Sequence, residues 1–319
     1  MNSPEKLPSI SDSEFEISAF TCTYNRIDTL VRTYQSLQQQ SVRNFEWIVY
    51  DNGSTDNTKE IVEQWQQEAD FPIVITGRPD NSGIQRGYNK GIELARGYFW
   101  LSLDSDDELV PEAFETLVAI WLSIPEEKRY GFTGVSTNCV DQHGNIVGET
   151  FPFDVTDSNS LEIYYRYKVR GEKFGMHRVD VLRQFPFPDV DEHVNPAVVW
   201  WAIAKKYQTR FTNDTLRIYY IEEDDRADQL SFHTTLGANS YGRRLNHMHN
   251  LNHNIEWFKV DPVQFVKHAG AYTACSMSQG MGLLQALSEI KPLVAKLLVV
   301  IALPPAFIFY WRHKTKTKA

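Results

Sequence analysis

Residues 98–107 read Tyr-Phe-Trp-Leu-Ser-Leu-Asp-Ser-Asp-Asp, a mostly apolar run that ends in three aspartates within four positions. The run predicts a buried strand over residues 98–103. Carboxylates this close repel one another unless a cation lies between them, and hard divalent ions such as Mg²⁺ or Mn²⁺ prefer oxygen ligands. The stretch therefore predicts a strand that leads into a metal-binding Asp-x-Asp cluster. A solvated acidic turn is the alternative interpretation.

The chain before this stretch alternates strands with helices. Apolar runs predict three earlier strands, at residues 17–23, 45–50 and 71–76. Helical spacing of apolar residues predicts helices at residues 25–40, after Asp56, and at 87–96. Such alternation is typical of a mostly parallel sheet, which binds ligands at the carboxyl ends of its strands. We therefore expect three polar clusters to meet at one edge of the sheet, those at residues 23–26, 51–53 and 104–107.

The second half of the chain is less regular. Residues 132–140 and 146–150 predict a β-hairpin around the turn 141–145. The other expected elements are a helix at 198–206, strands at 209–213 and 216–221, and a solvated acidic loop at 222–225. The predicted organisation is a disordered N-terminus (1–14), an α/β domain (15–235) and a helical C-terminal extension (236–319).

Composition narrows the class of protein. The 319 residues carry 32 Lys and Arg against 41 Asp and Glu, and a net charge of −9 argues against nucleic acid as the main partner. Mean hydropathy is −0.40, which argues against a polytopic membrane protein. Three cysteines cannot build a disulfide framework, and the N-terminus shows no apolar signal segment. We expect a globular protein of the cytoplasm.

The C-terminal segment combines apolar and basic residues. Residues 283–298 place aliphatic side chains at helical spacing, and the apolar run 297–311 is interrupted by Pro304 and Pro305. The run is short for a membrane span, which needs about 20 residues. Residues 312–319 follow with four Lys and Arg and no acidic residue. The segment predicts a helix in the interface of an anionic membrane, and a helix buried on the main domain is the alternative.

Two phosphate-binding signatures are missing: no Gly-x-Gly-x-x-Gly follows the first strand, and no P-loop motif occurs. Four motifs instead resemble those of family 2 glycosyltransferases, in the same order and spacing. They are Thr-Cys-Thr-Tyr-Asn-Arg at 21–26, Tyr-Asp-Asn-Gly-Ser-Thr-Asp at 50–56, Asn-Ser-Gly at 81–83 with Arg-Gly-Tyr-Asn at 86–89, and Leu-Asp-Ser-Asp-Asp at 103–107. The resemblance covers roughly residues 16–225. It implies an α/β fold of the GT-A type, a Rossmann-like mixed sheet flanked by helices. It also implies inverting transfer of a sugar from a nucleotide donor, with Mg²⁺ or Mn²⁺ as cofactor.

The resemblance also implies roles for the residues that match its motifs. Seven positions are implied to bind the nucleotide sugar: Thr23, Tyr24, Arg26, Asp51, Gly83, Arg86 and Asp104. Thr23 and Tyr24 would line the base pocket, and Asp51 would accept a hydrogen bond from the base, typically uracil. Gly83 would let the backbone approach the donor, and Arg86 would bring charge near the diphosphate. Asp104 and Asp106 would hold the metal.

Inversion needs a base that takes the proton from the acceptor hydroxyl. The resemblance implies an acidic residue shortly before a helix with a tryptophan like Trp200, but that position falls on Asn195-Pro196. The nearest carboxylates, Asp191 and Glu192, are our candidates for the base. His193 is a third, and ordinary loop residues are the alternative for all of them.

Other groups of residues could carry chemistry, but their patterns favour a role in packing. The spacing of His247, His249 and His253 could present a metal-binding pair, but an apolar stripe beside them favours a packed amphipathic helix. Trp200, Trp201 and Trp257 could stack on sugar rings, but burial is favoured. Cys22, inside the first strand, predicts packing rather than nucleophilic chemistry.

The resemblance and the C-terminal segment together imply a cytoplasmic enzyme attached peripherally to the inner face of the cell membrane through that segment. It would transfer a hexose from a nucleotide-diphosphate donor, with UDP expected, to a hydroxyl of a glycan or lipid-linked acceptor in cell-surface polysaccharide biosynthesis. The expected partners are the donor, the acceptor and an anionic membrane surface, without nucleic acid. A catalytically weak donor-binding or scaffold protein and a sugar nucleotidyltransferase are the alternatives.

Overall fold

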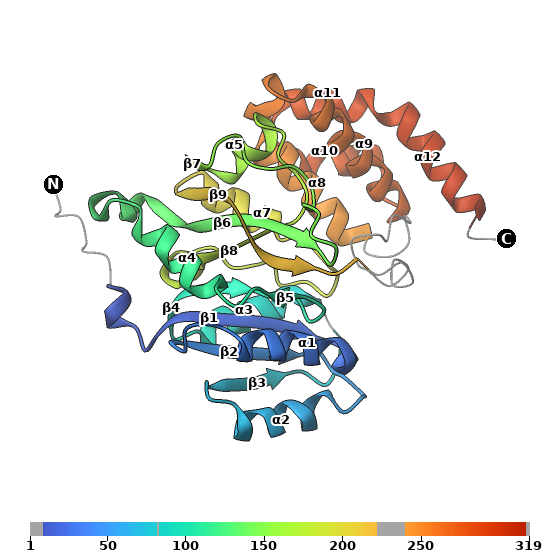
Figure 1. The fold of residues 1–319 in the computed structure, drawn as a ribbon. Helices are drawn as coiled ribbons and strands as arrows, with labels where there is room; N and C mark the ends of the chain where they lie inside the picture. Colours follow the sequence, from blue (N-terminus) through green and yellow to red (C-terminus); the bar gives the residue numbers. More distant parts are fainter. Residues whose placement is uncertain (1–8, 82, 222–239, 317–319) are drawn as a thin grey trace. The chain divides into compact units, whose positions relative to one another are not determined.

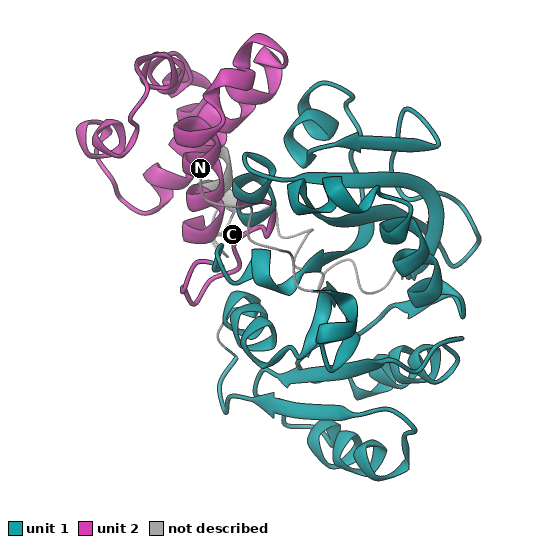
Figure 2. Cartoon of the chain, turned by 90° about the vertical axis from the view of Figure 1, so that its left-hand side faces the viewer, with its two compact units in different colours: residues 1–187, 199–221 teal, residues 188–198, 222–319 magenta. Residues whose placement is uncertain are grey.

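The computed structural model describes residues 9–81, 83–221 and 240–316 (Figure 1). The chain divides into two compact units, which Figure 2 colours separately. Unit 1 holds residues 1–187 and 199–221, and unit 2 holds residues 188–198 and 222–319.

Some predicted features fall outside the described residues. They are the acidic run at 222–225, the domain boundary at residue 235, and residues 1–8 of the N-terminus. Within the expected disordered N-terminus, Ile10–Asp12 form a short 3-10 helix, η1. The side chain of Ser9 caps this helix by accepting a hydrogen bond from the backbone N–H of Ser11.

Unit 1 is built on one mixed sheet with the strand order β3-β2-β1-β4-β8-β6-β9-β5, and β7 pairs with β9. The strands are β1 (Phe15–Thr23), β2 (Phe45–Asp51), β3 (Ile73–Gly77), β4 (Gly97–Ser102), β5 (Glu108–Leu109), β6 (Phe132–Asp141), β7 (Val155–Ser158), β8 (Lys173–Arg178) and β9 (Gln208–Tyr219). The first four strands pair in parallel, whereas β8 is antiparallel to both β4 and β6. The predicted parallel sheet is confirmed as one half of a mixed sheet.

Apolar layers cover both faces of the parallel strands, because successive side chains point to opposite sides. Phe45, Trp47 and Val49 of β2 belong to a core cluster with residues of helices α1, α2 and α4. On the other face, Phe20 and Trp100 stack with ring centroids 5.5 Å apart. The helices of unit 1 are α1 (Ile27–Gln38), α2 (Thr58–Glu68), α3 (Ile84–Leu94), α4 (Ala113–Leu122), η2 (Glu126–Gly131), α5 (Ser160–Tyr165) and α6 (Val179–Leu182), and α7 (Ala197–Ala204) enters it from residue 199.

Two expectations for the second half of the sheet are wrong. Residues 146–150 do not form a hairpin strand: they contribute one bridge, from Ile146 to Val140, and β6 pairs with β8 and β9 instead. The strands expected at 209–213 and 216–221 form the single strand β9. The side-chain oxygen of Asn213 accepts hydrogen bonds from the Asn138 amide and the Phe151 backbone, so a polar residue is tolerated inside the strand.

Unit 2 is helical in the part that the structure describes. Its helices are α8 (Ser240–His253), η5 (Ile255–Lys259), α9 (Pro262–Ser278), α10 (Leu283–Glu289), α11 (Leu293–Ile301) and α12 (Leu303–Lys316). Helix α9 packs against α8, α11 and α12. Arg244 of α8 pairs with Glu289, and the Tyr272 hydroxyl donates to the carbonyl oxygen of Ala286 at 2.8 Å. Buried polar contacts thus connect α8, α9 and α10.

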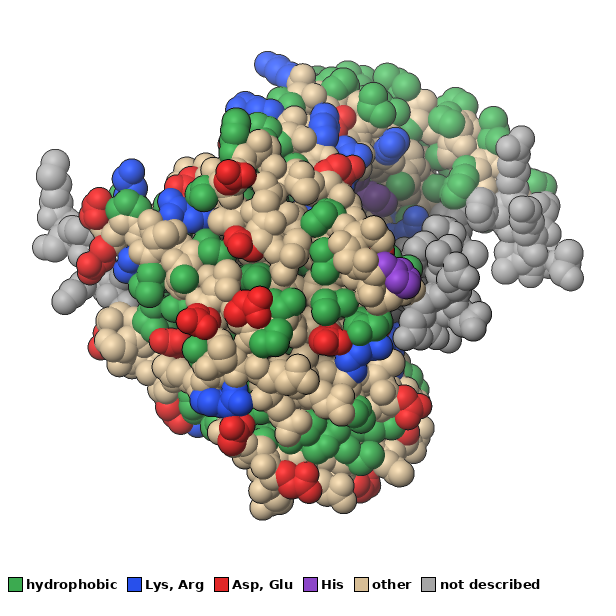
Figure 3. All heavy atoms as spheres, viewed as in Figure 1, with side chains coloured by type: hydrophobic (Ala, Val, Ile, Leu, Met, Phe, Trp, Pro, Cys, Tyr) green, Lys and Arg blue, Asp and Glu red, His purple; other side chains and the backbone are tan. Residues whose placement is uncertain are grey.

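Helices α10 to α12 expose large apolar side chains. Leu284, Leu293 and Ile301 are 85%, 72% and 68% exposed. Figure 3 shows hydrophobic side chains gathered over these C-terminal helices. Among the described residues, no single helix has the length and hydropathy of a membrane span, but α11 and Leu303–Trp311 meet that criterion together as a pair bent by 48°.

His177 of β8 is a half-buried histidine whose charged form the fold disfavours. Its ring stacks on Trp200 with centroids 4.6 Å apart, and burial lowers its pKa to about 4. In the unfolded chain the pKa returns to about 6.5, so the unfolded chain binds this proton first as the pH falls. The free energy of unfolding should therefore decrease between pH 6.5 and pH 4, and this contribution is fully present above pH 6.5.

Urea unfolding at pH 7 and at pH 5 measures this contribution. We expect protonation linked to His177 to lower the free energy of unfolding by about 2 kcal/mol from pH 7 to pH 5. His177→Gln, which removes the titrating group, should lose less stability than the wild type by about that amount. Equal losses in the two proteins would contradict the prediction.

Candidate active site

Strands β2, β1 and β4 are neighbours in the sheet and end at the same edge. The backbone N–H of Asn52 donates to the carbonyl oxygen of Thr23 at 2.9 Å, which joins the first two strand ends. The guanidinium of Arg26 pairs with the carboxylate of Asp106, which joins the third. The predicted meeting of the three polar clusters is confirmed.

Two residues with positive φ shape the loops at this edge. Asn25 has a φ of 50°, and its side-chain oxygen accepts a hydrogen bond from the backbone N–H of Thr55 at 2.7 Å. Gly53 has a φ of 88°, and a Cβ there would lie 2.9 Å from the backbone of Pro79. Glycine is therefore required at position 53, and the loops after β1 and β2 are held against each other.

The residues expected around the nucleotide base lie at the ends of β1 and β2. Thr23 is buried, and its hydroxyl has no hydrogen-bond partner among the described residues, so a polar group is left for a ligand. Thr23 pairs in register with Asp51, whose Oδ1 accepts a hydrogen bond from the backbone N–H of Ser54 at 2.9 Å. Tyr24 is 41% exposed, so its ring is accessible for stacking.

Gly83, expected to let the backbone approach the donor, and Arg86, expected near the diphosphate, lie at the start of α3. Gly83 has a φ of 63° and is the residue before the first helical turn. Arg86 follows within that turn. A helix start offers backbone N–H groups and a positive partial charge, which suit phosphate oxygens.

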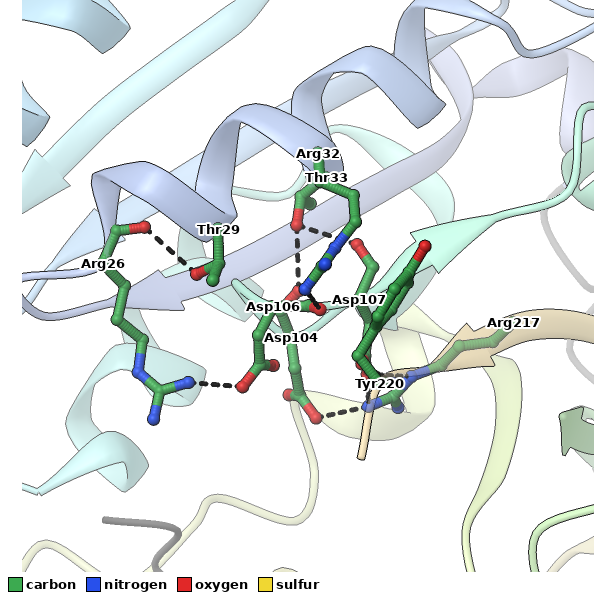
Figure 4. A network of polar contacts seen from close by, with 9 residues as sticks. All are labelled: Arg26, Thr29, Arg32, Thr33, Asp104, Asp106, Asp107, Arg217 and Tyr220. Carbon is green, nitrogen blue, oxygen red and sulfur yellow. Dashed lines mark hydrogen bonds and ion pairs between the residues drawn. The ribbon is translucent and has the colours of Figure 1, made fainter. Parts of the chain in front are cut away.

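The aspartate cluster, Asp104, Asp106 and Asp107, is paired with arginines (Figure 4). Arg217 of β9 contacts both Asp104 and Asp107, and its Nε donates to Asp107 at 2.6 Å. Arg26, the residue before α1, pairs with Asp106. Each carboxylate therefore has a cationic partner supplied by another element.

Helix α1 also binds the backbone of the cluster. The hydroxyl of Thr33 donates to the carbonyl oxygen of Asp107 at 2.9 Å, and Arg32 donates to that of Asp106 at 2.5 Å. The guanidinium of Arg32 lies 3.4 Å from the ring centroid of Tyr220, at the end of β9. These contacts fix the loop after β4 to a rigid helix (Figure 4).

Burial and neighbouring charges shift the proton affinities of the cluster. Burial raises the pKa of Asp107, although the nearby Arg217 acts in the opposite direction. Burial and the charge of Asp104 also raise the pKa of Asp106. Burial disfavours the charge on Arg217, but the two carboxylates outweigh it and hold the pKa of Arg217 well above its ordinary range. Arg217 is therefore a permanent cation at the site.

The cluster fits a divalent cation whose coordination is completed by substrate. Within residues 9–81, 83–221 and 240–316, no group of three His, Cys, Asp or Glu side chains is arranged to hold a metal ion. Mg²⁺ is usually held by one or two carboxylates together with phosphate oxygens and water. Asp106, with 27% of its side chain exposed, offers such a carboxylate.

Three residues of the site, Arg217, Arg32 and Tyr220, are not among those predicted from the sequence. A signal for Arg217 was present, because it lies in a predicted strand between Leu216 and Ile218. An arginine that is buried with such a strand needs a carboxylate partner. Arg32 and Tyr220 had no comparable signal.

The two candidates for the catalytic base belong to the segment 188–198 of unit 2. The Glu192 carboxylate accepts hydrogen bonds from the backbone N–H groups of Tyr241 and Gly242 at 2.9 and 3.2 Å. These N–H groups belong to the first turn of α8, so Glu192 stabilises a helix start.

A local structural role also explains the unexpected Asn195-Pro196. The Asn195 side-chain oxygen accepts a hydrogen bond from the backbone N–H of Ala197 at 2.8 Å, at the start of α7. Proline is favoured next to such a cap, because its missing N–H costs nothing in the first helical turn. The pair begins a helix where the resemblance implied an acidic residue.

Three sets of residues that were weaker candidates for a functional role, the histidines of α8, the tryptophans and Cys22, have packing roles. Nδ1 of His247 lies 2.9 Å from Nδ1 of His268, so the two rings share a hydrogen bond. Burial lowers the pKa of His247 to about 3, which favours its neutral form. Trp201 is 6% exposed. Burial raises the pKa of Cys22 to about 12, which excludes a thiolate nucleophile.

Comparison with known proteins agrees with this geometry. The sequence model of the family described as glycosyl transferase family 2 matches residues 18–135. That range contains most of β1, all of β2 and β4, and the aspartate cluster that follows β4.

Two curated relatives are similar over different lengths. The GalNAc(5)-diNAcBac-PP-undecaprenol beta-1,3-glucosyltransferase of Campylobacter jejuni is 26% identical over 233 residues, which cover 72% of this chain and 70% of that protein. The putative teichuronic acid biosynthesis glycosyltransferase TuaG of Bacillus subtilis is 31% identical over 125 residues, which cover 39% and 48%.

Solved structures share the fold at low sequence identity. TarS of S. aureus (residues 1–349), in complex with UDP-GlcNAc, superposes with a TM-score of 0.57 at 17% identity, over 92% of this chain and 80% of that one. The mannosyltransferase PcManGT of Pyrobaculum calidifontis, in complex with GDP-Man and Mn²⁺, superposes with a TM-score of 0.52 at 16% identity, over 99% and 87%. The sheet order and these similarities agree: the chain is a glycosyltransferase on a GT-A fold, and its residues 18–135 match the family 2 model.

Proposed function

We propose that the protein transfers a hexose, with inversion, from a UDP-sugar to a hydroxyl of a lipid-linked glycan during assembly of a cell-surface polysaccharide. The observation that carries this proposal is the edge where the aspartate cluster lies beside Thr23 and Asp51. Its carboxylates can hold a metal ion that is bound to a diphosphate. The buried Thr23 hydroxyl, which has no hydrogen-bond partner among the described residues, can bond to a nucleotide base. The similar TarS structure binds UDP-GlcNAc, and the Campylobacter relative is named for a PP-undecaprenol-linked glycan.

The chemistry follows from the bond that must break. It joins the anomeric carbon of the sugar to a diphosphate, so negative charge gathers on the leaving group. Mg²⁺ or Mn²⁺, when bound through Asp106 and Asp104, supplies Lewis-acid stabilisation of that charge. In this proposal Arg86, in the first turn of α3, would bind the diphosphate, and Thr23, Tyr24 and Asp51 would orient the nucleotide base.

The proton on the acceptor hydroxyl must leave as the new bond forms, and we assign this step to Asp191 or Glu192. Asp191→Asn and Glu192→Gln, made separately, should identify the base through a fall in kcat of about 100-fold or more in one of them. The Glu192 variant should also lose about 1 kcal/mol of stability, because its contact with α8 weakens. If both variants keep wild-type turnover, the assignment is wrong, and the enzyme uses another base.

The donor proposal is tested by calorimetric titration of UDP into the wild-type protein, with and without Mn²⁺. We expect binding that tightens when Mn²⁺ is present. Absence of binding for UDP would refute the UDP assignment, and GDP, dTDP and CMP would then be compared in the same way. Donor binding without transfer to any lipid-linked acceptor would favour the scaffold interpretation.

We also propose that helices α10 to α12 attach the enzyme peripherally to the cytoplasmic face of the membrane. Their exposed apolar side chains provide the contact area, and the basic residues 312–319 provide attraction to anionic lipid. An apolar pocket of about 350 Å³ between α9 and α12, lined by Ala274 and Phe309 among others, adds space for a hydrocarbon chain.

Membrane attachment predicts that a triple variant, Leu284→Ser, Leu293→Ser and Ile301→Ser, binds phosphatidylglycerol vesicles at least about 10-fold more weakly than the wild type. All three side chains are largely exposed, so the fold should tolerate the changes. Tyr130→Ser, at an exposed position of unit 1, is the matched control and should bind like the wild type. Equal sedimentation of the triple variant and the wild type would refute the attachment.

A further inference from the structure

The two arginines that pair with carboxylates of the aspartate cluster are held differently. The side chains of Arg217 and Asp107 are 6% and 1% exposed. Those of Arg26 and Asp106 are 32% and 27% exposed. A buried pair cannot separate without leaving an unpaired charge in the interior, whereas a half-exposed pair can separate into solvent at little cost.

This difference divides the three carboxylates. Arg217 binds Asp107 and also Asp104, so two of the three already have a fixed cationic partner. Asp106 is the remaining carboxylate, and its partner Arg26 is the exchangeable one (Figure 4). A cation that enters the cluster through Asp106 therefore competes with Arg26.

The charges at the site determine when a cation can displace Arg26 from Asp106. Asp106 and Arg26 neutralise each other in the free site. A divalent cation alone would displace Arg26 and leave an excess of positive charge at the site. A nucleoside diphosphate that arrives with the cation restores the balance and offers the displaced guanidinium a new anionic partner.

We propose that Arg26 exchanges between two anions, Asp106 in the free enzyme and the diphosphate of the bound donor, and so makes the binding of divalent cation and nucleoside diphosphate strongly cooperative. The inference rests on the proposed function, because it requires a nucleotide donor. It adds that the cation binds weakly by itself and that Arg26, rather than a third carboxylate, controls this.

Electron paramagnetic resonance of free Mn²⁺ tests the exchange without any measurement of activity. In the wild type, UDP should tighten Mn²⁺ binding by about 100-fold, a coupling within the usual range, and Mn²⁺ should tighten UDP binding by the same factor. Arg26→Gln should bind Mn²⁺ alone about 10-fold more tightly and the Mn²⁺–UDP pair more weakly, so the coupling collapses. Arg26→Lys, which keeps the charge, should preserve weak binding of Mn²⁺ alone.

Arg32→Gln is the matched control, because it removes the same charge from α1 but from a residue that donates to the backbone of Asp106 rather than to its carboxylate. It should retain most of the coupling. The inference is overturned if Arg26→Gln keeps the wild-type coupling, or if Arg32→Gln abolishes it equally. If the wild type binds neither UDP nor Mn²⁺–UDP, the proposed function itself has failed.

Discussion

Asp106→Asn should lower the rate of sugar transfer by about 1,000-fold, a loss typical of removing one electrostatic contact to a developing charge. Asp106 is the carboxylate of the cluster that is not held by the buried Arg217. Asparagine has nearly the same shape but cannot neutralise a cation, so the charge on the leaving diphosphate loses its stabilisation. The fold should persist, because Asp106 binds α1 through its backbone carbonyl.

The rate is measured as kcat/KM with saturating acceptor, and calorimetry of the same variant should show UDP binding that no longer responds to Mn²⁺. Asp70→Asn is a suitable control, since Asp70 pairs with Arg43 on the surface and 64% of its side chain is exposed. It should transfer sugar at the wild-type rate. An Asp106→Asn enzyme with more than about a tenth of wild-type activity would show that this carboxylate does not hold the metal.

Arg217→Met should reduce the free energy of unfolding by about 3–5 kcal/mol, the usual cost of breaking a buried ion pair from one side. Methionine fills a similar volume, but it leaves Asp107 in the interior without its cation. The loss of a buried partner, rather than the loss of packing, dominates the effect.

Urea unfolding at neutral pH measures this loss. The double variant Asp107→Asn/Arg217→Met should recover at least half of it, because the unpaired charge is removed as well. Lys59→Met is the control from an exposed pair: Lys59 and Glu63 lie 3.8 Å apart, with 66% and 51% of their side chains exposed. It should change stability by less than about 0.5 kcal/mol. A comparable change in both single variants would mean that Arg217 is not an essential buried partner.

The local pattern of apolar residues was sufficient to predict the strands and helices in the first half of the fold. The strands β1, β2 and β4 and the helices between them lie within a few residues of their predicted positions, because each is an uninterrupted run with its own periodicity. The convergence of their polar ends also followed from sequence, since parallel neighbours end at one edge.

The second half could not be predicted in the same way. The parallel pairing of β6 with β9 joins segments far apart in the chain, and the local turn at 141–145 suggested a hairpin that forms only one bridge. Tertiary pairing overrode the local preference, because a long partner strand satisfies more backbone groups than a short hairpin does.

The sequence by itself determined the chemistry at the sheet edge: an Asp-x-Asp cluster after a buried strand, beside Thr23 and Asp51. Only the tertiary structure decided how that cluster is neutralised, because Arg217 reaches it from β9, about a hundred residues later in the chain. The same holds for Asn195-Pro196, which begins α7, and for Glu192, which stabilises α8. Charge partners and helix caps are chosen by proximity in space, and the order of residues along the chain does not encode that proximity directly.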